Sequence, residues 1–103
     1  MQEDRDWQRL DTWLWCARFL KARAESAWLI QGGLVRINRQ PTDKPHARLR
    51  LGDVVTLPLQ RDVVVVRVVA LAQRRGPATE ARRLYEPVDP PGEDAMQDAL
   101  HTG

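Results

Sequence analysis

The spacing of apolar residues in the first third of the chain constrains the fold more than any other feature of the sequence. One stripe has the i, i+3, i+4, i+7 spacing of a helix face: Leu10, Trp13, Leu14 and Ala17. A second has the i, i+4, i+7, i+8 spacing: Ala22, Ser26, Leu29 and Ile30. The pattern predicts two consecutive helices, the second beginning at Ala22 or Arg23 and ending at Gly32 and Gly33, because glycine commonly terminates helices.

The rest of the chain is typical of short strands. Residues 34–38 predict a strand, 38–41 a turn, 43–50 a polar basic loop, 54–57 a strand, 60–62 a turn and 63–72 the longest strand. Gly76 and Pro77 then open a short helix that runs through Tyr85. We therefore expect one α+β domain of two N-terminal helices packed on a small antiparallel sheet, with a short C-terminal helix.

Charge is distributed unevenly along the 103 residues. All 16 Lys and Arg residues lie between Arg5 and Tyr85, where seven acids leave a net charge of +9, whereas the five acids after Tyr85 give −5. A basic body favours a polyanionic partner such as nucleic acid. The acidic tail, residues 87–103, is rich in proline and is expected to be disordered.

Several functional classes lack the residues they need. Cys16 is the only cysteine, and His46 and His101 are far apart without ligand-spaced companions, so no metal site is expected. No phosphate-binding glycine loop or nucleophile motif is present, and no apolar run approaches the roughly 20 residues of a membrane span. We expect a monomeric, cytoplasmic, non-enzymatic protein without a cofactor or a small-molecule substrate.

Three aromatic residues leave alternatives open. Trp15 and Phe19 fall outside the first apolar stripe, so they are either buried on a second side or displayed to a partner. Trp28 projects from the face of its helix opposite the apolar stripe, where it covers a loop or offers a stacking surface. Displayed rings would favour a protein-interaction module, in which the cations serve solubility.

Two helices, a double glycine and a strand occur in the order of a known family. The residues concerned are Arg9-Leu10-Asp11, Trp13-Leu14, Lys21, Arg23, Ile30-Gln31-Gly32-Gly33, Val35, Asn38 and Gly52-Asp53-Val54. They resemble the S4-type RNA-binding domain, with its L-shaped α-L motif. Four further segments resemble the ribosome-associated heat-shock protein 15 family: Trp13-Leu14-Trp15, Arg18-Phe19, Arg74-Arg75-Gly76-Pro77-Ala78 and Leu84-Tyr85-Glu86.

The resemblance implies a domain over residues 9–86 with a core motif over 9–57, preceded by residues 1–8. Its implied partners are ribosomal RNA and the free large ribosomal subunit carrying peptidyl-tRNA, whose recycling under stress the protein would aid. An accessory domain of an RNA-modifying enzyme is the alternative within the same class. The implied RNA-binding residues are Arg9, Arg18, Lys21, Arg23, Arg36, Arg39 and Lys44.

This chain departs from the family pattern at three places. Ala22 stands where a Ser or Thr cap is common, which would cost about 1 kcal/mol of stability. Arg39 replaces the usual glycine after Asn38, so we expect the tight turn to differ. Some members carry a long basic C-terminal extension, whereas this chain ends in an acidic one.

Overall fold

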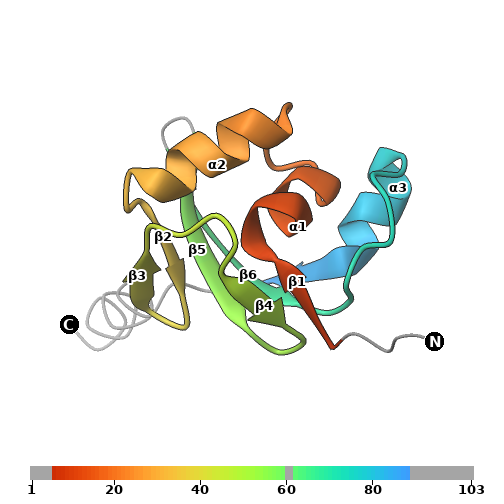
Figure 1. Cartoon of the computed structure of the whole chain (residues 1–103). Helices are drawn as coiled ribbons and strands as arrows, with labels where there is room; N and C mark the ends of the chain where they lie inside the picture. Colours follow the sequence, from red (N-terminus) through yellow and green to blue (C-terminus); the bar gives the residue numbers. More distant parts are fainter. Residues whose placement is uncertain (1–5, 60–61, 89–103) are drawn as a thin grey trace, which may run out of the picture.

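Two helices cover one face of a five-stranded antiparallel sheet, and a two-stranded ribbon and a short third helix flank them (Figure 1). This computed structural model describes residues 6–59 and 62–88. The elements are β1 (Trp7–Arg9), α1 (Leu10–Cys16), α2 (Arg23–Gln31), β2 (Val35–Ile37), β3 (Gln40–Thr42), β4 (Arg48–Arg50), β5 (Val54–Leu59), β6 (Asp62–Val68), α3 (Ala78–Ala81), the 3-10 turn η1 (Arg82–Leu84) and β7 (Tyr85–Pro87).

The sheet has the strand order β3-β2-β5-β6-β7, and every neighbouring pair is antiparallel. Val55 and Leu57 of β5 alternate with less buried residues and point to the helices, as period-two side chains on a half-covered sheet should. They meet the fully buried Leu10, Trp13 and Leu14 of α1 in one core. The predicted α+β class and the two-helix start are thus confirmed.

The ends of α2 agree with the sequence. Ala22 has no side-chain acceptor, so only Glu25 caps this end, accepting the backbone N–H groups of Lys21 at 3.0 Å and Ala22 at 3.2 Å. At the other end Gly33 has φ +75°, a conformation that suits glycine. The double glycine is therefore a helix stop, as predicted.

The ribbon formed by β1 and β4 was missed. Residues 48–50 were expected to be loop, but Arg48–Arg50 pairs antiparallel with Trp7–Arg9. Each strand has three residues and its partner lies about 40 positions away, so local periodicity could not indicate the pairing. Likewise β3 begins within the positions assigned to a turn, and residues 7 and 8 join the ribbon although we placed them before the domain.

The longest strand ends earlier than predicted. We expected residues 63–72, but β6 stops at Val68, because the N–H groups of Val69 and Ala70 both turn to the Leu84 carbonyl oxygen, at 2.8 and 3.2 Å. At the sheet edge the N–H of Val88 donates to Val65 O at 2.9 Å, so the first residues assigned to the tail join the sheet. Residues 60 and 61 of the expected turn, and 89–103 of the tail, lie outside the described residues.

The turn between β2 and β3 is tighter than expected. Ile37 pairs with Gln40, which leaves the two-residue loop Asn38-Arg39, and both residues have positive φ, 52° and 74°. That conformation is the one an Asn-Gly loop adopts, so the prediction of a different turn was wrong. Arg39 instead occupies a position that favours glycine.

Replacing Arg39 by glycine should raise the free energy of unfolding by about 1 kcal/mol. A side chain in the left-handed region costs about 1–2 kcal/mol, and part of that gain is offset because glycine loses more backbone entropy on folding. Urea denaturation measures the change. Arg36→Gly, in the neighbouring strand, is the matched control and should destabilise the protein. A loss of stability in Arg39→Gly would contradict the strained-turn interpretation.

Candidate nucleic-acid interface

A buried carboxylate connects Arg9, the last residue of β1, with Arg23, the first residue of α2. Asp11, only 5% exposed, accepts hydrogen bonds from Arg9 Nε at 3.1 Å and Arg9 Nη2 at 3.0 Å. The hydroxyl of Thr12 lies 3.3 Å from Asp11 Oδ1 and accepts a bond from Arg23 Nη2 at 3.3 Å. The hydrogen bonds to Asp11, and then the negative charge of that carboxylate, raise the pKa of Arg9. The carboxylate therefore holds Arg9 directly and Arg23 through one hydroxyl.

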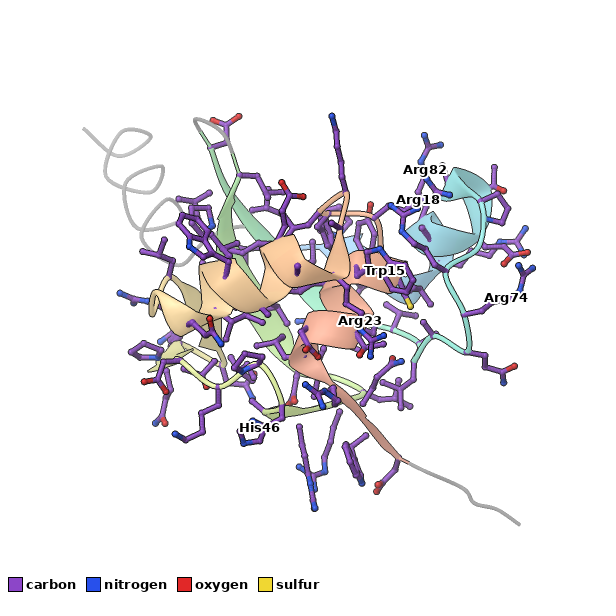
Figure 2. All side chains as sticks on the ribbon, turned by 45° about the horizontal axis from the view of Figure 1, so that its top comes forward. Trp15, Arg18, Arg23, His46, Arg74 and Arg82 are labelled. Carbon is purple, nitrogen blue, oxygen red and sulfur yellow. The ribbon has the colours of Figure 1, made fainter. Side chains whose placement is uncertain are left out.

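Trp15 lies beside two guanidinium groups. The guanidinium carbon of Arg23 is 5.9 Å from the ring centroid and that of Arg75 is 5.4 Å away, both within cation–π range. Arg75 comes from the loop before α3, and its Nε donates to the Trp15 carbonyl oxygen at 3.1 Å. Trp15 and Arg23 are neighbours beside α2 (Figure 2). The half-buried Trp15 ring thus contacts one cation from α2 and one from the loop before α3.

Arg18 ends α1 and binds the loop before α3, in addition to supplying a positive charge. Its φ of 66° and the bonds Arg18 N–H to Trp15 O (3.0 Å) and Phe19 N–H to Leu14 O (3.2 Å) form a Schellman cap on α1. Its Nε donates to Gly76 O at 2.8 Å. Arg18 and Arg75 thus tie α1 and the loop together in opposite directions. Figure 2 places Arg18 next to Arg82, on the α3 side of Trp15.

The remaining predicted cations are exposed and lie elsewhere. Lys21 is in the α1–α2 link, and Lys44, which lies 3.7 Å from Asp43, is in the loop before β4. Arg36 and Arg39 belong to the β2–β3 hairpin, at the end of α2 away from Arg23. Among residues 6–59 and 62–88, hydrogen bonds therefore join only Arg9 and Arg23 of the seven predicted residues, while the others surround this pair or lie on the hairpin.

Two arginines that lie over tryptophan rings were not among the predicted residues. Arg75 was noticed only as part of a family-like segment, and Arg48, which stacks on Trp7 at 4.5 Å, only as part of a basic loop. The repeated arginines before Gly76-Pro77 were the available signal for Arg75. The contact between Arg75 and Trp15 could not be predicted from local patterns, because the two residues are 60 positions apart in the sequence.

Three aromatic alternatives are now decided. Phe19 packs between Trp13 and Tyr85, with centroid distances of 6.1 and 4.7 Å, so it belongs to the core. Trp28 is 73% exposed, which makes it a surface ring rather than a cover. Trp15 is intermediate and carries the arginines described above.

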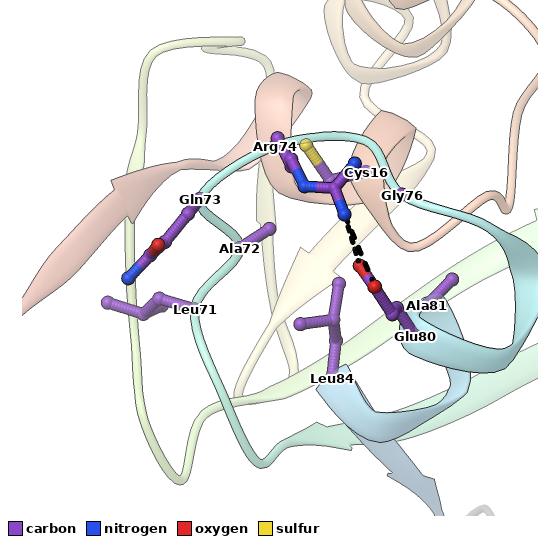
Figure 3. Close-up of a pocket in the computed structure, with 9 residues that line it drawn as sticks. All are labelled: Cys16, Leu71, Ala72, Gln73, Arg74, Gly76, Glu80, Ala81 and Leu84. Carbon is purple, nitrogen blue, oxygen red and sulfur yellow. Dashed lines mark hydrogen bonds and ion pairs between the residues drawn. The ribbon is translucent and has the colours of Figure 1, made fainter.

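Cys16 lines a cavity of about 210 Å³ beneath the loop, where Arg74 pairs with Glu80 at 3.3 Å (Figure 3). This is smaller than the roughly 300–1,000 Å³ of ordinary ligand pockets. Burial raises the pKa of the thiol, against the opposing charges of Arg23 and Arg75, so the thiol is protonated at neutral pH. Over residues 6–59 and 62–88 no metal-binding cluster is found, and no helix is long and apolar enough to cross a membrane.

The fold is that of an S4-domain protein, and the family model described as S4 domain matches residues 8–55. Heat shock protein 15 of Escherichia coli K12 is 45% identical over 78 residues, which are 76% of this chain and 58% of that protein. The Aeromonas salmonicida homolog is 38% identical over an equal length. The chain spans less than two thirds of these curated relatives.

A solved structure, described as trimeric Vibrio cholerae heat shock protein 15, covers 92% of this chain and is itself covered to 95%. Its TM-score is 0.78 and its sequence identity 30%. This chain therefore belongs to the heat shock protein 15 family. The resemblance noted in the sequence and the S4-like fold are both confirmed.

Proposed function

We propose that this protein is a cytoplasmic, non-enzymatic RNA-binding protein that binds structured ribosomal RNA through the α1–α2 face. The observation that carries the proposal is the group formed by Arg9, Arg23 and Arg75 around Asp11 and Trp15. Planar guanidinium groups bridge phosphate oxygens, and groups already held by hydrogen bonds lose less side-chain entropy on binding. The remaining predicted residues, Arg18, Lys21, Arg36, Arg39 and Lys44, extend this face in the proposal.

The finer proposal concerns the target. We propose further that the protein associates with the free large ribosomal subunit carrying peptidyl-tRNA and aids its recycling under stress, as its resemblance to the heat shock protein 15 family implies. The fold suits such a target, because fixed cations read the shape and phosphates of folded RNA rather than base sequence. The monomeric state stays a prediction for this chain, while the Vibrio cholerae relative is described as trimeric.

Sedimentation of a cell extract tests the target. The protein should travel with free large subunits, and less should travel with intact ribosomes or small subunits. Magnesium depletion, which splits ribosomes, should increase the bound fraction. Recovery of the protein only at the top of the gradient, with RNA binding intact in isolation, would contradict ribosomal association and leave the RNA-binding proposal standing.

Trp28 favours a second candidate function, docking to another protein. Its side chain is 73% exposed on α2, and the ring is a typical interface anchor. Under this candidate, Trp28→Ala abolishes partner binding while charge reversal at Lys21 and Arg23 spares it. RNA binding should respond in the opposite way, so the two variants separate the functions.

A further inference from the structure

The outer face of the β1–β4 ribbon carries an unusual concentration of positive charge. Pairing of Gln8 with Leu49 sends these two side chains inward, where Leu49 is fully buried and Gln8 exchanges two 2.9 Å hydrogen bonds with the Ala72 backbone. Side chains alternate along strands, so the neighbouring positions share the opposite face. Those outward residues, which we call the ribbon face, are Trp7, Arg9, Arg48 and Arg50.

The arrangement costs stability and is not explained by the fold. Arg9 lies directly across from Arg48, and like charges at such positions destabilise a strand pair. Arg9 is compensated by Asp11, but neither Arg48 nor Arg50 forms an ion pair with any carboxylate among residues 6–59 and 62–88. Two uncompensated guanidinium groups beside a third suggest an anionic partner.

The ribbon face is also partly preorganised. The Arg48 guanidinium carbon lies 4.5 Å from the Trp7 ring centroid, which holds the group while leaving its N–H edge available. The backbone of Arg50 is fixed by the bond from its N–H to Asp53 Oδ2 at 2.9 Å. Two carboxylates flank the ribbon strands in sequence: the exposed Asp6 before β1, and this Asp53 after β4, whose second oxygen accepts from Asn38 Nδ2 at 3.0 Å.

We propose that the ribbon face is a second contact for the phosphodiester backbone of the RNA bound by the α1–α2 face. This inference rests on the proposed function. Arg9 belongs to both surfaces, since it pairs with Asp11 and lies across from Arg48. Hydrogen bonds through Asp11 and Thr12 then connect Arg9 to Arg23, so guanidinium groups follow one another from the ribbon face to the α1–α2 face. Planar guanidinium groups match the geometry of phosphate oxygens. A protein partner would instead be expected to need an apolar groove beside them.

The test compares Arg48→Gln/Arg50→Gln with Arg82→Gln/Arg83→Gln, in which two exposed arginines of η1 lose the same charge. Filter binding to purified large-subunit ribosomal RNA, at several salt concentrations, is the measurement. The ribbon variant should bind about tenfold more weakly near 0.1 M salt, and its log–log salt slope should be shallower by about 1.4 to 1.8. The η1 variant should change affinity by a smaller factor, about threefold or less, because both its arginines lie outside the ribbon face, although Arg82 lies next to Arg18 (Figure 2).

Arg48→Lys/Arg50→Lys should recover the salt slope, because lysine also releases counterions, and so separates charge from any folding defect. The inference is overturned if ribbon and η1 variants bind RNA alike. It is also overturned if the ribbon variant keeps its RNA affinity and loses only its association with protein-containing subunits, which would indicate a protein contact. Failure of the wild-type protein to bind RNA would remove the proposed function itself, whereas an effect of Arg23 alone would remove only the ribbon contact.

Discussion

Replacing Trp13 by alanine should lower the free energy of unfolding by about 4 kcal/mol, the cost typical of deleting a large buried aromatic side chain. Trp13 is 0% exposed, and its rings contact Phe19 and Tyr85 at centroid distances of 6.1 and 6.5 Å. Its Nε1–H donates to Ala70 O at 3.0 Å, where the chain leaves β6. The change therefore opens a cavity and leaves a carbonyl without its partner.

Urea denaturation measures this loss. Trp28→Ala is the matched control, because that ring is largely exposed and its removal should change stability by about 0.5 kcal/mol or less. A domain with the usual 5–15 kcal/mol of stability would keep little margin without Trp13. Equal stabilities of the two variants would contradict the assignment of Trp13 as the centre of the core.

Reversing the charges of Lys21 and Arg23 to glutamate should weaken RNA binding about a hundredfold, since charge-assisted hydrogen bonds contribute about 1.5–3 kcal/mol each. Both side chains are exposed, so the core should survive. Arg23 is the larger contributor, because it is fixed by Thr12 and lies beside Trp15. The new carboxylates would also repel phosphate next to Arg75.

Arg82→Glu/Arg83→Glu is the control, with the same change of net charge on η1. Circular dichroism establishes that both variants are folded, and filter binding to large-subunit ribosomal RNA compares their affinities. A much weaker effect of the η1 variant supports a localised site. Equal losses would show that net charge alone drives binding and would contradict the α1–α2 face.

Local patterns predicted the helices because their determinants are close in sequence. The stripe at Leu10, Trp13 and Leu14 is fully buried, and Gly33 ends α2 in the backbone conformation that glycine favours. The strand after the glycines was also expected, and it forms as Val35–Ile37. Each of these features depends on residues within about two helical turns.

Long-range pairings could not be predicted in this way. The β1–β4 ribbon joins three-residue strands, and the end of β6 depends on Leu84, fifteen residues after Val69. For the interface, the resemblance drew attention to Arg9 and Arg23, which the structure joins through Asp11 and Thr12. The contribution of Arg75 depends on how its loop docks on α1, through contacts with Trp15 and Gly76 that no local pattern encodes.

The salt dependence of RNA binding by the unaltered protein tests the central claim most directly. We expect phosphate contacts from at least the five arginines Arg9, Arg23, Arg48, Arg50 and Arg75, to which the surrounding cations, Lys21 among them, add. Filter binding to large-subunit ribosomal RNA should then give a log–log slope at least as steep as roughly −3.5 to −4.5. An affinity that stays flat from low to high salt would contradict an RNA-binding face built from fixed arginines.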